Sequence, residues 1–394
     1  MKKLILICMI IICMFMVSGC KKATKAINTS DATVAVKEQI TEEATKTTKT
    51  PEAASVTENP SKDTVQNSTR DIVDMAGRTV RIPETIESAF GVNNNASILL
   101  YTLAPELMIG WNSVLSEKSK KYITASEYNL PALGTLIGNS EEVNLEEIIA
   151  KNPNLIIFLQ PDINDKAIQT ADKLQKKLSI PVVMVDGGFE QYDKAYDFLG
   201  SLLGREEKAS SLAKYCEDTY KLAASVKETY AAEASCTIYY GSGKDGLTTV
   251  AADSSQSATI DMLGAVNVVD SKNLSKENSS ISIEELMTLN PQYIILGNSG
   301  FTSGGVSDNL NMAKGWNTLL AVMNDKVYKI PQLPFNWFDK PPSVNRILGI
   351  HWLISILYPD YKQEDIVIQT KEYFKLFYHV EIKEAEIRKM LGIK

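Results

Sequence analysis

The segment "EEIIAKNPNLII", Glu146 to Ile157, is repeated as "EELMTLNPQYII", Glu284 to Ile295, and the two copies share six of twelve residues. A polar residue, Asn144 or Ser282, stands three positions before a glutamate in each copy, which is the pattern of a helix N-cap. Each predicted helix ends at Asn-Pro, because a residue before proline is disfavoured in helical geometry. An apolar run typical of a strand buried on both faces follows. Two copies of a helix that leads into an inner strand predict two similar α/β lobes.

The two glutamates that open each copy differ in their predicted roles. Glu147 and Glu285 take the third helical position and close the cap. Glu146 and Glu284 lie one residue earlier and have no such local role. A carboxylate in the first turn is favourable from the helix dipole alone, so these two residues can also be purely structural. The residues by themselves leave both interpretations open.

The first 70 residues differ in composition from the remainder. Two lysines and an uncharged apolar run precede Val17-Ser18-Gly19-Cys20, which predicts a signal peptide over residues 1–19. The surroundings of Cys20 resemble the lipobox of bacterial lipoproteins, which implies a lipid on Cys20; a signal anchor with an incidental cysteine is the alternative. Residues 20–70 are dominated by Thr, Ala, Lys, Glu and Ser, without aromatic residues or leucine. We expect a disordered tether there, because so little apolar surface cannot offset the entropy of ordering.

The remaining residues, 71–394, are too many for an average single domain and fit two. Residues 205–232 contain no Gly or Pro and keep apolar residues near helical spacing, which predicts a stiff linking helix roughly 40 Å long. The sequence thus predicts an N-terminal α/β lobe over 71–204 and a C-terminal α/β lobe with terminal helices over 233–394. Strands that alternate with helices favour mostly parallel sheets.

Individual elements follow from the same patterns. A hairpin is expected over residues 74–82, around Ala76-Gly77. The other predicted strands are 86–91, 107–111, 155–159, 181–185, 236–240, 266–269, 293–296 and 326–330. Helices are expected over 343–357 and across 364–391.

Composition and charge exclude several functions. The formal net charge is −7 and the head has no Lys/Arg block, which argues against a nucleic-acid partner. Cys216 and Cys236 lack metal-ligand spacing; they can form a disulfide outside the cell or remain free thiols. The chain has only two histidines, His351 and His379, too few for the His-rich sites of zinc or manganese receptors. We interpret His351 as a core residue.

Two further patterns are of kinds associated with chemical function. "GSGKDG", residues 241–246, matches G-x-G-x-x-G, but the residues after it predict extended chain rather than the helix that a dinucleotide site requires. Asp253-Ser254-Ser255 and Asp339 can be combined with His351 into a hydrolase site, although no spacing requires it. A secreted, lipid-anchored hydrolase is therefore an alternative from a different class, and a structural or adhesive surface lipoprotein is another.

Six segments and the long helix are informative because of the order in which they occur along the chain. The segments are "DIVDMAGRTVRIP", "LPALGTLIGNSEEVNLEEIIAKNPNLII", "SATIDMLGAVNVV", "SIEELMTLNPQYII", "GWNTLLAVMNDKVYKIP" and "FNWFDKPPSVNRILGIHWLISILYP". Together they resemble the solute-binding proteins of ABC importers for cobalamin and ferric siderophores, over residues 71 to about 360. The resemblance implies the class III periplasmic binding protein fold, in which a single long α-helix joins two Rossmann-like lobes. It also implies no catalytic activity and no cofactor.

The resemblance also implies roles for individual residues. In that family an exposed glutamate on each lobe pairs with arginines of the permease, and the matching residues are Glu146 and Glu284. The ligand lies between the lobes, against loops that follow strand ends. The matching ligand-binding candidates are Asn94, Trp111, Gln160, Tyr240, Trp337, Phe338 and Arg346. An anionic ligand would favour Arg346 or Lys340 nearby; Trp111 can instead be packing at a strand end, and Arg346 can brace the last helices.

These expectations combine into one hypothesis. The chain is a monomeric receptor anchored by the Cys20 lipid on the extracytoplasmic face of the cell membrane. It captures an iron(III) chelate of the siderophore type and delivers it to an ABC permease. Haem, cobalamin or another corrinoid, or a different metal complex, are alternative ligands. The long tether favours a cell with a thick wall and no outer membrane.

Overall fold

The computed structural model describes residues 68–137, 143–231, 233, 235–274, 279–297, 313–361 and 365–393. The predicted signal peptide, Cys20 and nearly all of the predicted tether lie outside these residues. The chain divides into two units, Met1–Pro60 and Ser61–Lys394, and all described residues belong to the second. None of the described helices is both long and apolar enough to cross a membrane.

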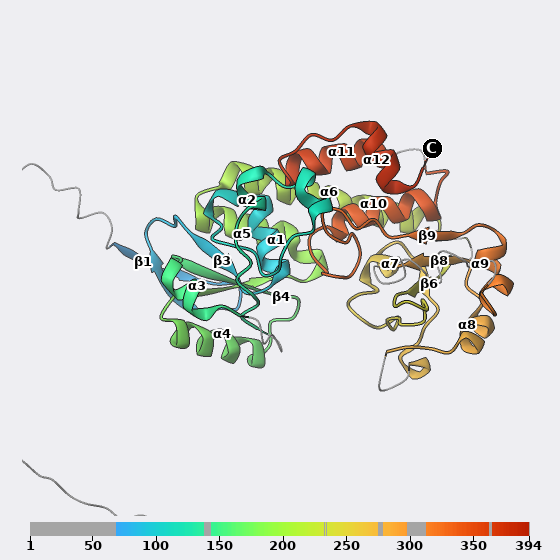
Figure 1. Cartoon of the computed structure of the whole chain (residues 1–394), viewed down its shortest axis with the longest axis horizontal. Helices are drawn as coiled ribbons and strands as arrows, with labels where there is room; N and C mark the ends of the chain where they lie inside the picture. Colours follow the sequence, from blue (N-terminus) through green and yellow to red (C-terminus); the bar gives the residue numbers. More distant parts are fainter. Residues whose placement is uncertain are drawn as a thin grey trace, which may run out of the picture. The chain divides into compact units, whose positions relative to one another are not determined.

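The N-terminal lobe contains a two-stranded hairpin and a three-stranded parallel sheet in the order β3-β4-β5 (Figure 1). The strands are β1 (Thr69–Val73), β2 (Thr79–Pro83), β3 (Ala89–Gly91), β4 (Leu155–Gln160) and β5 (Val182–Asp186). The helices are α1 (Asn94–Leu103), α2 (Ala125–Tyr128), α3 (Leu145–Lys151), α4 (Asp165–Leu178) and α5 (Tyr192–Leu203). The inner strand β4 is buried from Leu155 to Leu159, which explains why its sequence is continuously apolar.

The C-terminal lobe contains a four-stranded parallel sheet in the order β7-β6-β8-β9. The strands are β6 (Thr237–Gly241), β7 (Val266–Asn267), β8 (Tyr293–Leu296) and β9 (Val327–Lys329), and the short helices are α7 (Ala258–Met262), α8 (Ile283–Leu289) and α9 (Leu320–Met323). Three helices end the chain: α10 (Arg346–Leu357), α11 (Ile366–Phe377) and α12 (Glu384–Leu391). Short 3-10 turns occur at Pro105–Leu107, Glu117–Tyr122, Phe189–Gln191, Ser271–Asn273 and Trp316–Thr318.

The long helix α6 (Glu206–Thr229) contacts elements on both sides. It packs against α5 of the N-terminal lobe, α7 of the C-terminal lobe, and the terminal helices α10 and α11. Gly200 permits the close approach of α5, because a Cβ atom there would lie 2.3 Å from the Cβ of Ala209. The predicted fold class, parallel α/β lobes with one long helix, is confirmed.

Two local expectations need correction. Residues 107–111 were expected to form a strand, but they make only isolated bridges, from Met108 to Ala89 and from Trp111 to Ala132. A side chain at Gly110 would meet Leu133 at 2.6 Å, so the chain here is shaped by close packing rather than by a ladder. The helical region expected over 364–391 is divided into α11 and α12. The division lies near His379, whose φ of 61° is left-handed.

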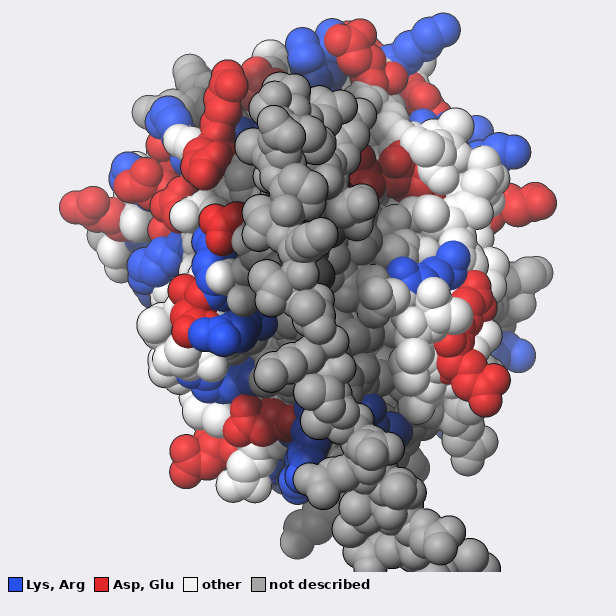
Figure 2. Space-filling model, turned by 90° about the vertical axis from the view of Figure 1, so that its left-hand side faces the viewer, with Lys and Arg blue, Asp and Glu red and all other residues white. Residues whose placement is uncertain are grey.

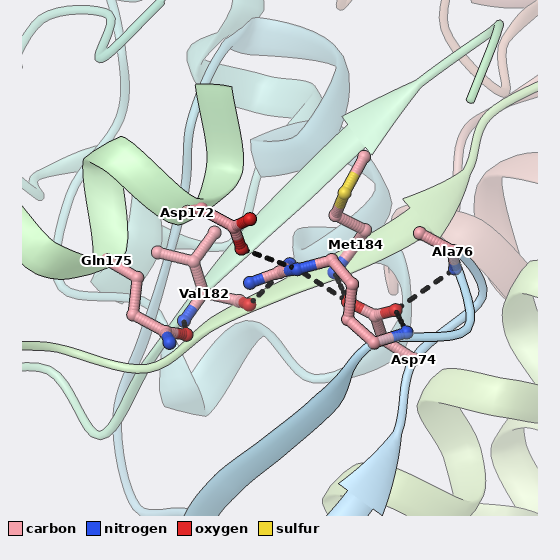
Figure 3. Close-up of polar contacts among 7 residues, drawn as sticks. Asp74, Ala76, Asp172, Gln175, Val182 and Met184 are labelled. Atoms are coloured by element: carbon pink, nitrogen blue, oxygen red, sulfur yellow. Dashed lines mark hydrogen bonds and ion pairs between the residues drawn. The ribbon is translucent and has the colours of Figure 1, made fainter. Parts of the chain in front are cut away.

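One buried carboxylate fixes the N-terminal hairpin to the edge strand β5 (Figure 3). Asp74 accepts hydrogen bonds from the Met184 amide and from the Arg78 guanidinium, each at 3.0 Å. Arg78 also pairs with Asp172 at 3.0 Å and donates to the Val182 carbonyl. Because Asp74 is only 4% exposed, these bonds replace the water that a carboxylate would otherwise require.

Candidate functional site

The two copies of the duplicated segment form the same capped helix. The Asn144 side chain accepts a hydrogen bond from the Glu147 amide at 3.0 Å, and Ser282 accepts one from the Glu285 amide at 3.1 Å. Both predicted caps are therefore confirmed. Each helix ends at an asparagine in the left-handed region, which asparagine tolerates better than most residues. These residues are Asn152, with φ of 44°, and Asn290, with φ of 39°.

The glutamates divide as their positions predict. Glu146 and Glu284 are exposed, whereas Glu147 and Glu285 are partly buried. Glu147 accepts a hydrogen bond from the Asn144 side chain at 2.9 Å. Within the part of the chain that the structure describes, the carboxylates of Glu146 and Glu284 have no hydrogen-bond or ion-pair partner. Each lobe thus presents one carboxylate without a local role.

Charge is mixed elsewhere on the surface. Figure 2 shows acidic and basic side chains interspersed over the described residues on the side that it presents. Most of the ion pairs, such as Arg81 with Asp71, join exposed side chains. Such pairs contribute little to stability.

A pocket of about 550 Å³ lies between the segment after Trp111 and the segment after β9. We call it the cleft pocket. Its lining residues are Ser113, Val114, Leu115, Ser116, Lys118, Ser119, Gln332, Leu333, Pro334, Phe335, Asn336, Lys340 and Pro341. The Ser119 hydroxyl donates to the Pro334 carbonyl at 2.9 Å and so joins the two walls. Two lysines, several hydroxyls and amides, and one aromatic ring therefore face a single cavity.

Phe335 is the aromatic side chain of the cleft pocket, and a second aromatic layer supports it. Its ring lies 5.7 Å from that of Trp111 and 6.4 Å from that of Tyr378. Trp111 is only 2% exposed, and its indole N–H donates to the Glu127 carbonyl at 2.8 Å. This arrangement matches the packing interpretation of Trp111.

Trp337 and Phe338, the two aromatic residues expected at the ligand, are buried beside the cleft pocket. The Trp337 indole N–H donates to the Leu333 carbonyl at 3.0 Å, and the residue is 1% exposed. Phe338 is fully buried and stacks on Tyr240, with ring centroids 5.3 Å apart. Sequence reasoning missed Phe335, although it lies in the same predicted loop. The available signal was that Phe335 is an aromatic residue of the loop 334–339, which was already expected at the ligand.

Tyr240 and Asp339 form a buried polar pair, and the charge of the buried Arg346 acts on Asp339. The Tyr240 hydroxyl donates to one oxygen of Asp339; the other oxygen has no partner among the described residues. Burial raises the pKa of Asp339 above its ordinary value. Burial lowers the pKa of Arg346, whose guanidinium lies 4.0 Å from the ring centre of Phe189 and donates to the Ser255 carbonyl at 2.6 Å. These contacts match the interpretation in which Arg346 braces α10.

The last two candidates lie at element ends. Asn94 begins α1 and accepts a hydrogen bond at 3.0 Å from Ser113, which lines the cleft pocket. Gln160 ends β4, and its carbonyl accepts from the Gly187 amide at 2.7 Å. None of the seven candidates is itself a lining residue of this cavity. Their ligand roles stay predictions.

The groups considered for other chemistry have local partners. His351 is 4% exposed on α10, and its Nε2 lies 3.0 Å from the Thr219 hydroxyl, so it is a core residue as predicted. The hydroxyl of Ser254 donates to the Ala251 carbonyl. After residues 241–246 the chain is extended, with Thr248 bridging to Ser242, so the helix of a dinucleotide site does not follow.

Cys216 and Cys236 are free thiols, Cys216 buried and Cys236 partly buried. Over the described ranges, the structure contains no group of three or more His, Cys, Asp and Glu side chains that could hold a metal ion.

Comparison with known proteins follows the fold. A family model described as periplasmic binding protein matches residues 99–333. The structure is similar to an ABC transporter solute-binding protein of Sulfurospirillum deleyianum, with 29% identity and a TM-score of 0.73 over 82% of this chain and 99% of that one. It is also similar to a periplasmic solute-binding protein of Veillonella parvula (23% identity, TM-score 0.68, 82% and 97% covered). The molybdate periplasmic binding protein of Haemophilus influenzae shares the fold (20%, TM-score 0.63, 80% and 99%). No curated protein sequence matches the chain.

Proposed function

We propose that this chain, which belongs to the periplasmic binding protein family and is a solute-binding protein of an ABC importer, captures an iron(III) chelate of the siderophore type. The family consists of extracytoplasmic substrate-binding proteins rather than enzymes. The observation that carries the proposal is the cleft pocket. One of its walls comes from residues 113–119 and the other from residues 332–341. Its volume of about 550 Å³ is within the usual range for small-molecule sites.

The lining of the cleft pocket supports an anionic, partly flat ligand. Lys118 and Lys340 offer positive charge to the oxygen-rich outer surface of a ferric chelate. The ring of Phe335 offers a face against which an aromatic or planar group can pack. Replacing both lysines by glutamine should weaken the binding of an anionic chelate more than that of a neutral one. The same change at Lys166, an exposed lysine of α4 that does not line the cleft pocket, is the matched control.

Docking to the permease is the second part of the proposal. Glu146 and Glu284 would pair with arginines of the two permease halves, one glutamate per lobe. Their exposure supports this role, as does the absence of partners for their carboxylates among the residues that the structure describes. Such contacts set register and encounter rate more than affinity, and they weaken as salt is added.

A lipid on Cys20 would hold the receptor at the membrane, so that delivery occurs close to the permease. Replacing Cys20 by alanine should release the protein from the cell without changing its affinity for ligand. Retention of the Cys20→Ala protein at the membrane would contradict lipid anchoring.

Native mass spectrometry of Ser61–Lys394 tests the ligand assignment. The protein is mixed with ferric hydroxamates, ferric catecholates, haemin, cobalamin and bare divalent metal ions. Retention of one intact ferric chelate is the expected result. Retention of haemin or cobalamin instead would replace the iron chelate by one of the alternative ligands. If no compound binds, or if one is recovered chemically altered, the receptor assignment fails.

A further inference from the structure

Two exposed apolar side chains occupy equivalent positions in the duplicated segment. Ile149 on α3 is 48% exposed and Met287 on α8 is 41% exposed. Each stands three residues after the exposed glutamate of its copy, Glu146 or Glu284. Only eight large hydrophobic residues in the described part of the chain are exposed to this degree, and two of them fall at matched positions.

The local structure places each apolar side chain beside its carboxylate. Residues three apart on a helix share one face. Ile148 and Leu286, which follow the two partly buried glutamates, are fully buried. Their burial fixes the rotation of each helix about its axis. Over residues 145–150 and 283–288 the burial pattern is the same at all six positions: partly buried, exposed, partly buried, buried, exposed, exposed. The two lobes therefore present the same pair of groups, one charged and one apolar.

A single exposed isoleucine or methionine would need no explanation, because scattered apolar residues are normal on protein surfaces. The surrounding positions show that the matched pair is different. Ala150 corresponds to Thr288, and Lys151 corresponds to Leu289, so neighbouring positions change character between the copies. Isoleucine is also a poorer helix former than alanine or lysine, so the helix alone gives no reason for Ile149.

We propose that Ile149 and Met287 are apolar contacts of the permease interface, each packing against one permease half beside the docking glutamate. This inference rests on the proposed function and extends it. The repeated pair fits a partner with two similar halves, each offering a basic group next to an apolar patch. A second copy of this chain fits poorly, because a symmetric contact through this face would bring exposed carboxylates together.

The two kinds of contact differ in their response to salt. Burial of apolar surface gives affinity that added salt does not screen, whereas exposed charge pairs are screened. Loss of one half-exposed aliphatic side chain from an interface should weaken binding about fivefold. Because Ile149 and Met287 lie on different lobes, their free-energy effects should be independent. The fold-changes in affinity should therefore multiply in the double variant.

The test compares three substitutions of similar chemistry. Ile149→Gln and Met287→Gln, singly and together, replace each apolar side chain by a polar one that also favours helices. Ile368→Gln is the matched control, since Ile368 is 53% exposed on α11, away from the duplicated segment. The measured quantity is the affinity of the receptor for the purified permease and ATPase complex of its importer in lipid nanodiscs, at low and high salt. Ligand affinity is measured in parallel as a check on folding.

We expect each single variant to bind about fivefold more weakly at both salt concentrations, and Ile368→Gln to bind as the wild type does. If the double variant binds like the control, the apolar contact is overturned while the proposed function stands. If the wild-type receptor does not bind the complex at all, the proposed function falls and the inference with it. If the wild type forms a dimer that the double variant loses, the occupant of this face is a second copy, which also overturns the inference.

Discussion

The two copies of the duplicated segment are alike at the surface and different in their surroundings. Helices α3 and α8 have the same cap, the same left-handed end and the same order of exposed and buried positions. The strands that follow them differ: β4 is the centre of a three-stranded sheet, and β8 lies within a four-stranded one. Packing alone would not require an exposed glutamate and an exposed apolar side chain at matched positions of both copies while the surrounding sheets differ. The repeated exposed pair supports a common partner, and the two lobes should respond to mutation independently.

The first prediction concerns the buried carboxylate of the N-terminal hairpin. Asp74→Ala removes the carboxylate that receives the Met184 amide and the Arg78 guanidinium. Because buried N–H groups lose their acceptor and the partly buried Arg78 keeps only Asp172 as a charged partner, we expect the free energy of unfolding to fall by about 3 kcal/mol. Chemical denaturation measures the change. Asp71→Ala, in the exposed pair with Arg81, is the control and should have little effect; an equal loss in both variants would show that Asp74 does not fix the hairpin.

The second concerns the carboxyl group of the loop after β9. Asp339 has a pKa raised chiefly by burial, so the folded protein holds this proton above the pH at which an unfolded chain releases it. Its contribution to stability is therefore complete below the unfolded pKa of about 3.9 and decreases as pH rises toward the folded pKa, by about 1.4 kcal/mol for each unit between them.

Asp339→Asn, which resembles the protonated form, should remove that dependence on pH. Denaturation of the ligand-free protein between pH 4 and pH 7, at intervals of roughly one unit, gives the comparison with wild type. The exposed Asp253→Asn is the control. Parallel stability profiles for wild type and Asp339→Asn would mean that this carboxyl is not protonated in the folded state.

The third and smallest effect compares the helix ends directly. Glycine relieves the left-handed strain at both asparagines, worth a few tenths of a kcal/mol. Asn290, however, also accepts a hydrogen bond from the Leu320 amide at 2.9 Å. We expect Asn152→Gly to be neutral or slightly stabilising and Asn290→Gly to be less stable by about 0.5–1 kcal/mol. Equal values from thermal unfolding would show that the Leu320 contact contributes nothing.

Features set by local sequence could be predicted, and features set by distant packing could not. The caps at Asn144 and Ser282 depend on residues three positions away, so the sequence contains them in full. Trp337 and Phe338 have the right chemistry for a ligand site but are buried by residues from elsewhere. For example, Gly349 of α10 approaches the Trp337 carbonyl so closely that a Cβ atom would lie 2.0 Å from it. No local sequence pattern predicts such a contact.

The exposure of Ile149 and Met287 could not be predicted from the sequence for the same reason. An apolar residue in a short helix reads as a core position until the rotation of that helix is known. The prediction of a strand over residues 107–111 was wrong. Gly110 packs against Leu133, which comes from a later segment, and this region makes only isolated bridges.

If the two lobes present equivalent docking carboxylates, charge reversal at either one should weaken permease binding to the same degree. Glu146→Lys, Glu284→Lys and the double variant are compared with Glu228→Lys, which reverses an exposed charge on α6. Because a lysine would repel the permease arginines, we expect the two single variants to lose similar affinity for the permease complex. We expect the double variant to abolish import and chelate affinity to be unchanged in all of them. Normal import by the double variant would show that Glu146 and Glu284 do not dock the permease.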